Sequence, residues 1–463
     1  MGYHDARVAL IFKKGDVADC ANYRPISLLP VGYKLFASVL LQRLKDAGAE
    51  SSLWKTQFGF RSKHGTLDAI FLARRLSEHA NVVTDQSLAL VALDRAKAFD
   101  SICPDKLCTS LERFGLPSKI LDAVRGIYSN RRFSVSDAGC TSDMHDQAFW
   151  ICQGCPLSPF LFGMLVTVLI TDARNLLAQS GVDLSSSLGI SELLYADDTL
   201  LVQTDAAVAQ KYMDCVQQAG RVYGLALNWD KVEVLSISCH SDLTDPAGKS
   251  LKQTQRMIYL GSVLCSDGSS GSEISRRIGS AKGDFDKLTK AWNHAGISRT
   301  RKLAIFDSCV LSKLLYNMHS LCLNTSEARR VDAFHVRCLR KILKIPPSFY
   351  SRVSNTTVLE QAGANTASSA LLERQLIWMG KLALRNDDDA LRQSIFQARA
   401  DRKAPKLPEG RRRRGRPRKC WAQQVFQHAV KAVGGANMLS NLWQHNPASK
   451  RAWIQHVRQY CHG

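Results

Sequence analysis

The sequence predicts an α/β (α+β) core followed by a mainly helical, basic C-terminal region. Residues 88–101 (LALVALDRAKAFDS) read as a buried strand that ends at Asp94. Residues 190–202 (ISELLYADDTLLV) place two apolar runs around a short polar centre, which is typical of a hairpin. Between residues 274 and 292 apolar side chains recur in steps of three and four, as on an amphipathic helix. Strands mixed with helices and then helices alone favour this fold class.

Further helices are expected along the chain. The longest uncharged window, 150–171, has the length of a membrane span, but Gly154, Pro156 and Pro159 interrupt its first half. We therefore expect a buried helix from about Phe160 to Ile170, and no membrane partner. Three later helical patterns lie at 303–316, 331–343 and 366–385, with Pro346 and Pro347 ending the second.

Length and charge restrict the class of protein. A chain of 463 residues is long enough for about three domains. It has 62 Lys and Arg against 41 Asp and Glu, a net charge of +21, and 45% hydrophobic residues, which excludes wholesale disorder. The excess of positive charge favours a nucleic-acid partner over an anionic membrane surface. Fourteen scattered cysteines in so large a chain indicate a reduced, intracellular protein.

The sharpest candidate site is Tyr195-Ala196-Asp197-Asp198, in the centre of the predicted hairpin. A bare Asp-Asp pair is more often an ordinary polar turn. Here both arms are apolar, and a third carboxylate, Asp94, stands at the end of another predicted strand. Three such carboxylates can bind two Mg²⁺ ions, which prefer oxygen ligands. Two ions can promote an in-line displacement at a phosphate, so the pattern predicts nucleotidyl transfer.

Several ordered segments carry a family resemblance. Together with the Asp-Asp hairpin they are similar to the reverse transcriptases of LINE-type (non-LTR) retrotransposons, over roughly residues 8–270. The helices up to about residue 345 look like the thumb of that family. The segments are Asn22–Leu29 (NYRPISLL), Gln57–Arg61 (QFGFR), Ala98–Asp100 (AFD), Gln153–Pro159 (QGCPLSP), Gly224–Leu225 with Asn228 and Lys231, and Tyr259–Gly261 (YLG).

The resemblance implies a right-hand polymerase with fingers, a ferredoxin-like palm and a helical thumb. It also implies an RNA-directed DNA polymerase that takes an RNA template, a DNA primer or target and deoxynucleotides (dNTPs). It leaves the oligomeric state open. The domains it implies are partial fingers at 1–90, interleaved with the palm, palm at 91–268, thumb at 269–347, and a C-terminal helical region at 348–463 with a basic linker at 401–419.

The resemblance also assigns roles to residues. Asp94, Asp197 and Asp198 are the expected ligands of two Mg²⁺ ions, with Mn²⁺ as a substitute, and Lys231 is the expected proton donor to pyrophosphate. Phe99 stands where the family carries a steric gate against ribose, although a core aromatic remains the alternative. The dNTP site is expected to contain Lys14, Arg24, Phe99, Gln153 and Gly154, and the primer grip Tyr259, Leu260 and Gly261, while Asp100 is expected to be structural.

Two basic surfaces point to nucleic acid. The segment 411–419 contains Arg-Gly-Arg-Pro, which resembles an AT-hook, but a nuclear-localisation signal and a disordered basic tether remain alternatives. It favours a nuclear location, with the cytoplasm, beside the element RNA, as a second one. The residues are Arg411, Arg412, Arg413, Arg414, Arg416, Arg418 and Lys419, and a thumb-like helix adds Arg329, Arg330, Arg337, Arg340 and Lys341.

Departures from the family keep two other readings open. Arg95 replaces an apolar or aromatic residue and could repel Mg²⁺ or reach a phosphate. The alternatives are a nucleic-acid-binding remnant of low activity and a group II intron maturase. The chain opens almost directly on the fingers, which suggests an N-terminally truncated product. The other departures are Cys152, Val232 and Lys381; a zinc site at Cys152 and Cys155 is disfavoured because no second ligand pair follows.

Overall fold

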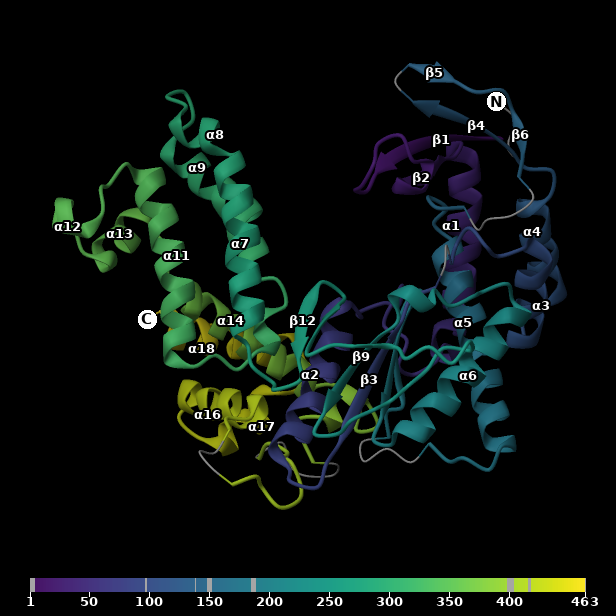
Figure 1. The fold of residues 1–463 in the computed structure, drawn as a ribbon. Coiled ribbons are helices and arrows are strands. Elements are labelled where there is room, and N and C mark those ends of the chain that lie inside the picture. Colours follow the sequence, from purple (N-terminus) through teal and green to yellow (C-terminus); the bar gives the residue numbers. More distant parts are fainter. Residues whose placement is uncertain are drawn as a thin grey trace. The chain divides into compact units, whose positions relative to one another are not determined.

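The chain folds into two compact units, each with its own hydrophobic core (Figure 1). One contains residues 1–69 and 88–254, and the other contains residues 70–87 and 255–463. The structure is a computed structural model. It describes residues 5–95, 98–137, 139–147, 152–184, 189–397, 404–414 and 418–462.

The first unit is built on a five-stranded sheet in the order β10-β9-β3-β8-β7. If β10 is left out and the other four strands are numbered as they occur in the chain, their order across the sheet is 4-1-3-2, and all neighbouring strands are antiparallel. This is the ferredoxin-like arrangement. Helices α5 and α6 connect the strands and pack on each other (Figure 1). The predicted palm fold is therefore confirmed. The bounds are β3 Leu88–Leu93, α5 Ser158–Gln179, β7 Glu192–Tyr195, β8 Asp198–Gln203, α6 Ala206–Val222, β9 Glu233–Ile237 and β10 Lys252–Gln253.

Helix α5 is the central core helix of this unit. Its length and hydropathy would allow it to cross a bilayer, but 72% of its most apolar window is buried inside the protein. Phe160, Phe162 and Leu165 are among its fully buried side chains. The buried helix expected over residues 160–170 is confirmed, and it extends further toward the C-terminus.

A second sheet in the same unit has the order β2-β1-β4-β5, with β6 also paired to β4. Strand β1 runs antiparallel to β2 and parallel to β4, and the loop between β1 and β2, which contains Lys13 and Lys14, lies at one end of the sheet. The elements are β1 Asp5–Phe12, β2 Tyr23–Leu28, α1 Val31–Asp46, α3 Pro104–Phe114, α4 Ser118–Tyr128, β4 Arg132–Asp137, β5 Cys140–Thr141 and β6 His145–Asp146.

The second unit is mainly helical. Helix α2 (Thr66–Val82) begins in the first unit, and its residues from Ile70 onward belong to the second. A hairpin of β11 (Arg256–Tyr259) and β12 (Ser262–Cys265) precedes the helices. These are α7 Gly271–Lys287, α8 Thr289–Asn293, α9 Arg299–Phe306, α10 Ser312–Leu314, α11 Thr325–Leu343, α12 Ser348–Ser351, α13 Asn355–Ala362, α14 Ala367–Ala383, α15 Ala390–Gln393, α16 Trp421–Val433, α17 Ala436–Leu442 and α18 Pro447–His462.

The predicted helices of this unit are present, with local differences. The helix expected at 274–292 is divided at Leu288 into α7 and α8. The one expected at 303–316 contains a π-helical turn at Asp307–Leu311. Helix α11 begins six residues earlier than expected because Asn324 forms a capping box with Glu327. The four predicted domain ranges remain predictions, although the range 1–90 is shared between the two compact units.

Candidate active site

The three predicted carboxylates meet at one end of the first unit's main sheet. Asp94 directly follows β3, Asp197 lies in the turn between β7 and β8, and Asp198 opens β8. Strands β3 and β8 are antiparallel neighbours with Leu93 opposite Thr199, so the end of β3 and the start of β8 coincide. Strand pairing alone therefore brings Asp94 close to Asp198, although the two residues are about a hundred positions apart in the sequence.

The carboxylates affect one another electrostatically. Part of the Asp198 side chain is accessible, yet desolvation by the surrounding protein, then repulsion from Asp197 and Asp94, raises its pKa to about 6. Desolvation followed by repulsion from Asp94 also raises the pKa of Asp197, while Arg95 and Arg24 oppose this change. Negative charge concentrated in this way favours a bound cation.

A divalent metal ion fits this donor set. All the donors are carboxylate oxygens, which Mg²⁺ and Mn²⁺ accept as ligands. Lys231 Nζ lies 2.9 Å from Asp94 Oδ2, so a cationic group already compensates one of the carboxylates. Among the described residues no group of three or more His, Cys, Asp or Glu side chains is arranged to hold a metal ion by itself. An open shell suits Mg²⁺, which usually keeps waters and substrate phosphates as ligands.

The Arg95 side chain is buried beside α6, although its charge still acts on Asp197. Its side chain is 4% exposed, and a Cβ added to Gly220 in α6 would meet its Nη1 at 3.1 Å. Desolvation lowers the pKa of Arg95 to about 10, although Asp197 opposes this change. In the described part of the chain its three guanidinium nitrogens make no hydrogen bond. The expectation that Arg95 could reach a phosphate is wrong, because the guanidinium is buried against α6.

The segment around Gln153 packs directly on β2. Ser27 N donates to Gln153 O at 2.7 Å, and Gln153 Nε2 donates to Asp100 Oδ1 at 3.3 Å. Gly154 has a φ of +119°, and a Cβ there would lie 2.5 Å from Ser27 O. Only glycine fits this approach. The two segments assigned to the nucleotide site by resemblance are therefore neighbours.

The other predicted nucleotide-binding residues differ in placement. Arg24 is exposed on β2, and its charge lowers the pKa of Asp197, so it lies within electrostatic reach of the carboxylates. Lys14 is exposed in the loop after β1. Phe99 is half-buried and stacks on Phe162 with ring centroids 4.5 Å apart. It is thus partly a core aromatic, and its role as a steric gate remains a prediction.

The predicted primer grip is the turn of the β11–β12 hairpin in the second unit. Tyr259 pairs with Ser262 across a two-residue turn in which Leu260 and Gly261 have φ values of 46° and 72°. Arg276 Nη1 donates to Gly261 O at 2.8 Å, and Arg277 Nη2 also donates to that oxygen. Helix α7 therefore fixes this turn.

The basic segment 411–419 is partly docked, not a free tether. Residues 82–84 and 411–413 pair, with Thr84 N donating to Arg411 O at 2.8 Å and Arg413 N to Val82 O at 3.0 Å. The Arg413 side chain donates to Val83 O and Ala80 O, and that of Arg418 donates to Asp267 O, so both serve the fold. Arg416 lies outside the described residues. All the described basic members of the cluster are exposed, and Arg413 and Arg418 also make the hydrogen bonds given above. They are Arg411, Arg412, Arg413, Arg414, Arg418 and Lys419.

Helix α11 needs a similar correction. Arg340 is buried and donates to Pro346 O at 3.0 Å, Val353 O at 2.7 Å and Asn355 Oδ1 at 3.0 Å. The expectation that it tracks a duplex is therefore wrong, because its donors are used inside the protein. The exposed basic residues of this helix are Arg329, Arg330, Arg337 and Lys341.

Sequence reasoning missed a buried polar cluster under the catalytic hairpin. Glu192, at the start of β7, is 1% exposed. It accepts from Trp54 Nε1 at 2.6 Å, Arg174 Nη2 at 2.9 Å and Tyr212 Oη at 2.6 Å. The one available signal was a lone acidic residue in an otherwise apolar strand. The cluster anchors the strand that leads into the turn.

Comparison with known proteins agrees with this geometry. Residues 11–264 match the family model described as reverse transcriptase (RNA-dependent DNA polymerase). The Pol polyprotein of the type-1 retrotransposable element R2 of Popillia japonica is 26% identical over 75% of this chain and 49% of its own length. The RNA-directed DNA polymerase of the mobile element jockey of Drosophila funebris is 26% identical over 74% of this chain and 38% of its own.

Among solved structures, telomerase from Candida tropicalis is 13% identical with a TM-score of 0.44, covering 99% of this chain and 64% of that one. The chain spans half or less of the length of the two retrotransposon relatives. The family model nevertheless covers more than half of the 463 residues. The chain belongs to the reverse transcriptase family, in its LINE-type (non-LTR) branch.

Proposed function

We propose that this chain is an RNA-directed DNA polymerase that adds deoxynucleotides to a primer 3′-OH on an RNA template. The observation that carries the proposal is the meeting of Asp94, Asp197 and Asp198 at one sheet edge within a reverse transcriptase domain. The electrostatic crowding of these carboxylates supports a requirement for cations.

The residues around the carboxylates suit this chemistry. Two Mg²⁺ ions, or Mn²⁺ in their place, would be held by Asp94, Asp197 and Asp198, and would supply charge neutralisation at the reacting phosphate. Arg24 is placed to contact a triphosphate with charge-assisted hydrogen bonds. Lys231 can leave Asp94 when that carboxylate gains another cation, and it can then donate a proton to pyrophosphate.

Primer extension tests the proposal. The purified chain is incubated with an annealed RNA template and DNA primer, dNTPs and Mg²⁺, and product lengths are resolved on a denaturing gel. We expect the primer to be extended with the nucleotides that the template sequence specifies. Extension should occur with dNTPs and should not occur with ribonucleotides. Tight binding of RNA without any extension, in Mg²⁺ or Mn²⁺, would contradict the proposal and favour the nucleic-acid-binding remnant.

Nucleic acid is proposed to contact two exposed basic surfaces of the second unit. One comprises Arg330, Arg337 and Lys341, whose spacing of seven and four residues puts them on one face of α11. The other comprises the exposed cluster side chains Arg411, Arg412 and Arg414. The same cluster supports a proposed nuclear location, because an importin can read exposed basic side chains in such a run.

Arg413, whose side chain donates to backbone carbonyls, and the other arginines of the cluster are predicted to behave differently. Replacing Arg411, Arg412 and Arg414 by Ala together should reduce the slope of log K against log salt for RNA binding by about 2, since each phosphate contact contributes ~0.7–0.9. Arg413→Ala should leave the slope unchanged and lower stability by about 1–2 kcal/mol, because two helix-end carbonyls lose their donors. Filter binding over a salt series and thermal unfolding measure both. Equal slopes for the triple variant and wild type would contradict the assignment.

Metal binding is predicted to stabilise the protein in a pH-dependent way. The pKa of Asp198 rises to about 6 on folding, so its contribution stabilises the metal-free protein at low pH and is lost as pH rises through 6. Ionised Asp198 then favours a cation. Excess Mg²⁺ should raise the thermal midpoint at pH ~7.5, with ~1–3 kcal/mol of stabilisation, and hardly at pH ~5. Asp198→Asn should remove most of this difference. The same Mg²⁺ effect at both pH values would contradict the prediction.

A further inference from the structure

The buried side chain of Gln57 connects the loop 54–61 to the catalytic turn. It is 0% exposed, and its Oε1 accepts from the backbone nitrogens of Ala196 at 3.1 Å and Gly59 at 2.9 Å. Both partners are donors, so the atom that faces them must be the amide oxygen. Within the described residues Nε2 has no hydrogen-bond partner. Burying that donor has a cost, which the interaction at Oε1 must offset.

The turn that Gln57 contacts has an unfavourable backbone conformation. Ala196 has a φ of 56°, in the left-handed region, and is 7% exposed. A residue with a Cβ is destabilised there by about 1–2 kcal/mol, so neighbouring contacts must maintain the conformation. The conformation of Ala196 sets the direction in which the next two residues, Asp197 and Asp198, leave the turn. Losing the contact to Ala196 N would therefore move the carboxylates.

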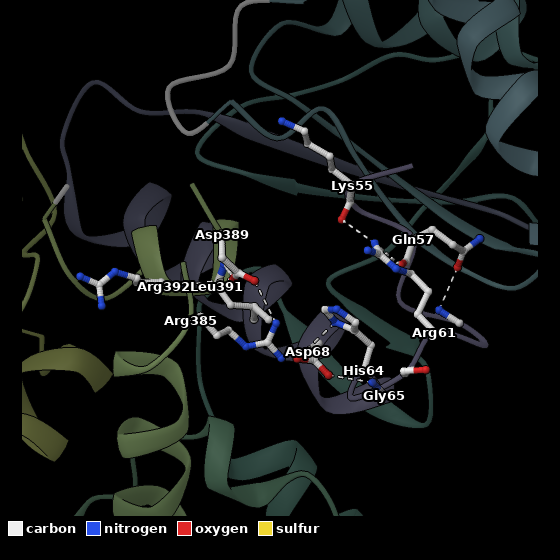
Figure 2. A network of polar contacts seen from close by, with 12 residues as sticks. Lys55, Gln57, Arg61, His64, Gly65, Asp68, Arg385, Asp389, Leu391 and Arg392 are labelled. Carbon is white, nitrogen blue, oxygen red and sulfur yellow. Dashed lines mark hydrogen bonds and ion pairs between the residues drawn. The ribbon is translucent and has the colours of Figure 1, made fainter. Parts of the chain in front are cut away.

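The loop is close enough and rigid enough to hold the turn. Leu194 N donates to Thr56 O and Phe58 N to Leu194 O, both at 2.9 Å, so the loop adds a short parallel pairing to β7. A Cβ on Gly59 would lie only 2.4 Å from Ala196 N. Arg61 Nη1 donates to Lys55 O at 3.4 Å and to Gln57 O at 3.3 Å (Figure 2). It also donates to Trp54 O at 3.3 Å. The backbone of the loop is thus fastened on both sides of Gln57.

We propose that Gln57 is a positioning residue for catalysis: it holds Ala196 in the left-handed conformation and so aims Asp197 and Asp198. It touches neither substrate nor metal. The proposal rests on the proposed polymerase function, and it deepens that function by naming a residue on which the catalytic geometry depends. A purely structural residue would affect the amount of folded protein and not the rate constant of each folded molecule.

The test compares substitutions of two buried glutamines, one that contacts the β7–β8 hairpin and one that lies in it. Gln57→Met keeps the length and apolar volume of the side chain and removes the acceptor. The matched control is Gln203→Met at the far end of β8; Gln203 is 4% exposed, and its Nε2 donates to Ser191 O at 3.2 Å. Three measurements are made: thermal unfolding, kcat and KM for dNTP incorporation, and hydrogen exchange of a peptide covering residues 192–200.

We expect Gln57→Met to lower kcat by roughly 10–100-fold, because small displacements of catalytic groups have effects of this size, with KM changed by less than ~3-fold. Exchange at Ala196 should become faster. Gln203→Met should keep kcat within ~2-fold of the wild-type value, even if its thermal midpoint falls as much as that of Gln57→Met. Equal kcat for the two variants at equal folded fraction would overturn the proposal.

If wild type itself incorporates no nucleotide, the polymerase function fails, and hydrogen exchange alone decides whether Gln57 holds the turn. Unchanged exchange over 192–200 in Gln57→Met would overturn the positioning role independently of turnover.

Discussion

Replacing Asp197 by Asn is expected to reduce nucleotide incorporation by at least ~10³-fold, equivalent to about 4 kcal/mol of transition-state stabilisation. Asp197 lies in the turn directly before Asp198, and desolvation followed by repulsion from Asp94 raises its pKa. An amide of the same shape cannot supply the negative charge that neutralises cations at the reacting phosphate. Single-nucleotide extension of a labelled primer, followed in a rapid-quench instrument, measures the loss.

The matched control for this substitution is Asp205→Asn. Asp205 caps α6 through a hydrogen bond from Val208 N at 3.0 Å, and asparagine caps helices about as well. The control removes the same charge from the same unit and keeps the cap, so incorporation should stay within ~2-fold. Residual activity of Asp197→Asn above about a tenth of wild type would mean that the three carboxylates are not the catalytic centre.

Glu192→Gln is expected to reduce the free energy of unfolding by about 3–5 kcal/mol, because it removes one partner of a buried ion pair. Glu192 is 1% exposed and accepts hydrogen bonds from Trp54, Arg174 and Tyr212. A glutamine amide would present its NH₂ to groups that are themselves donors, and Arg174 would lose its counter-charge. Urea unfolding followed by tryptophan fluorescence and circular dichroism measures the change.

Glu233→Gln on β9 of the same sheet provides the control. Its partner Lys252 is 65% exposed at the side chain, so solvent screens this ion pair. The variant should change stability by less than ~1 kcal/mol. Similar losses for both variants would show that the Glu192 cluster contributes no more than a surface pair.

Local patterns predicted the elements, and the motif order predicted the site. The hairpin at 190–202 and the strand at 88–93 follow directly from apolar runs that end at polar groups. Placing Asp94 beside Asp197 needed the family resemblance, since periodicity in one sequence contains no information about which strands pair.

The sequence could not predict the contacts that depend on the direction in which a side chain points. The sequence placed Arg95 beside the carboxylates, and its charge does act on Asp197, but the sequence could not show that its guanidinium is buried beside Gly220 of α6. Arg340 and Arg413 looked like nucleic-acid contacts because they are basic, and only the fold reveals that backbone carbonyls use their donors. Gln57 belongs to a segment that carries the family resemblance, but its contact with Ala196 could not be predicted, because the two residues are 139 positions apart.

The sheet order also constrains when the catalytic edge can form. Strand β3 is central, and its neighbours β8 and β9 come more than a hundred positions later in the chain. During synthesis one edge of the apolar strand β3 therefore stays unpaired until residue 203 has emerged from the ribosome, and the other edge until residue 237 has emerged. Non-local pairings of this kind fold slowly and leave aggregation-prone edges. Coexpressed chaperones should accordingly raise the yield of active chain more than a lower growth temperature alone.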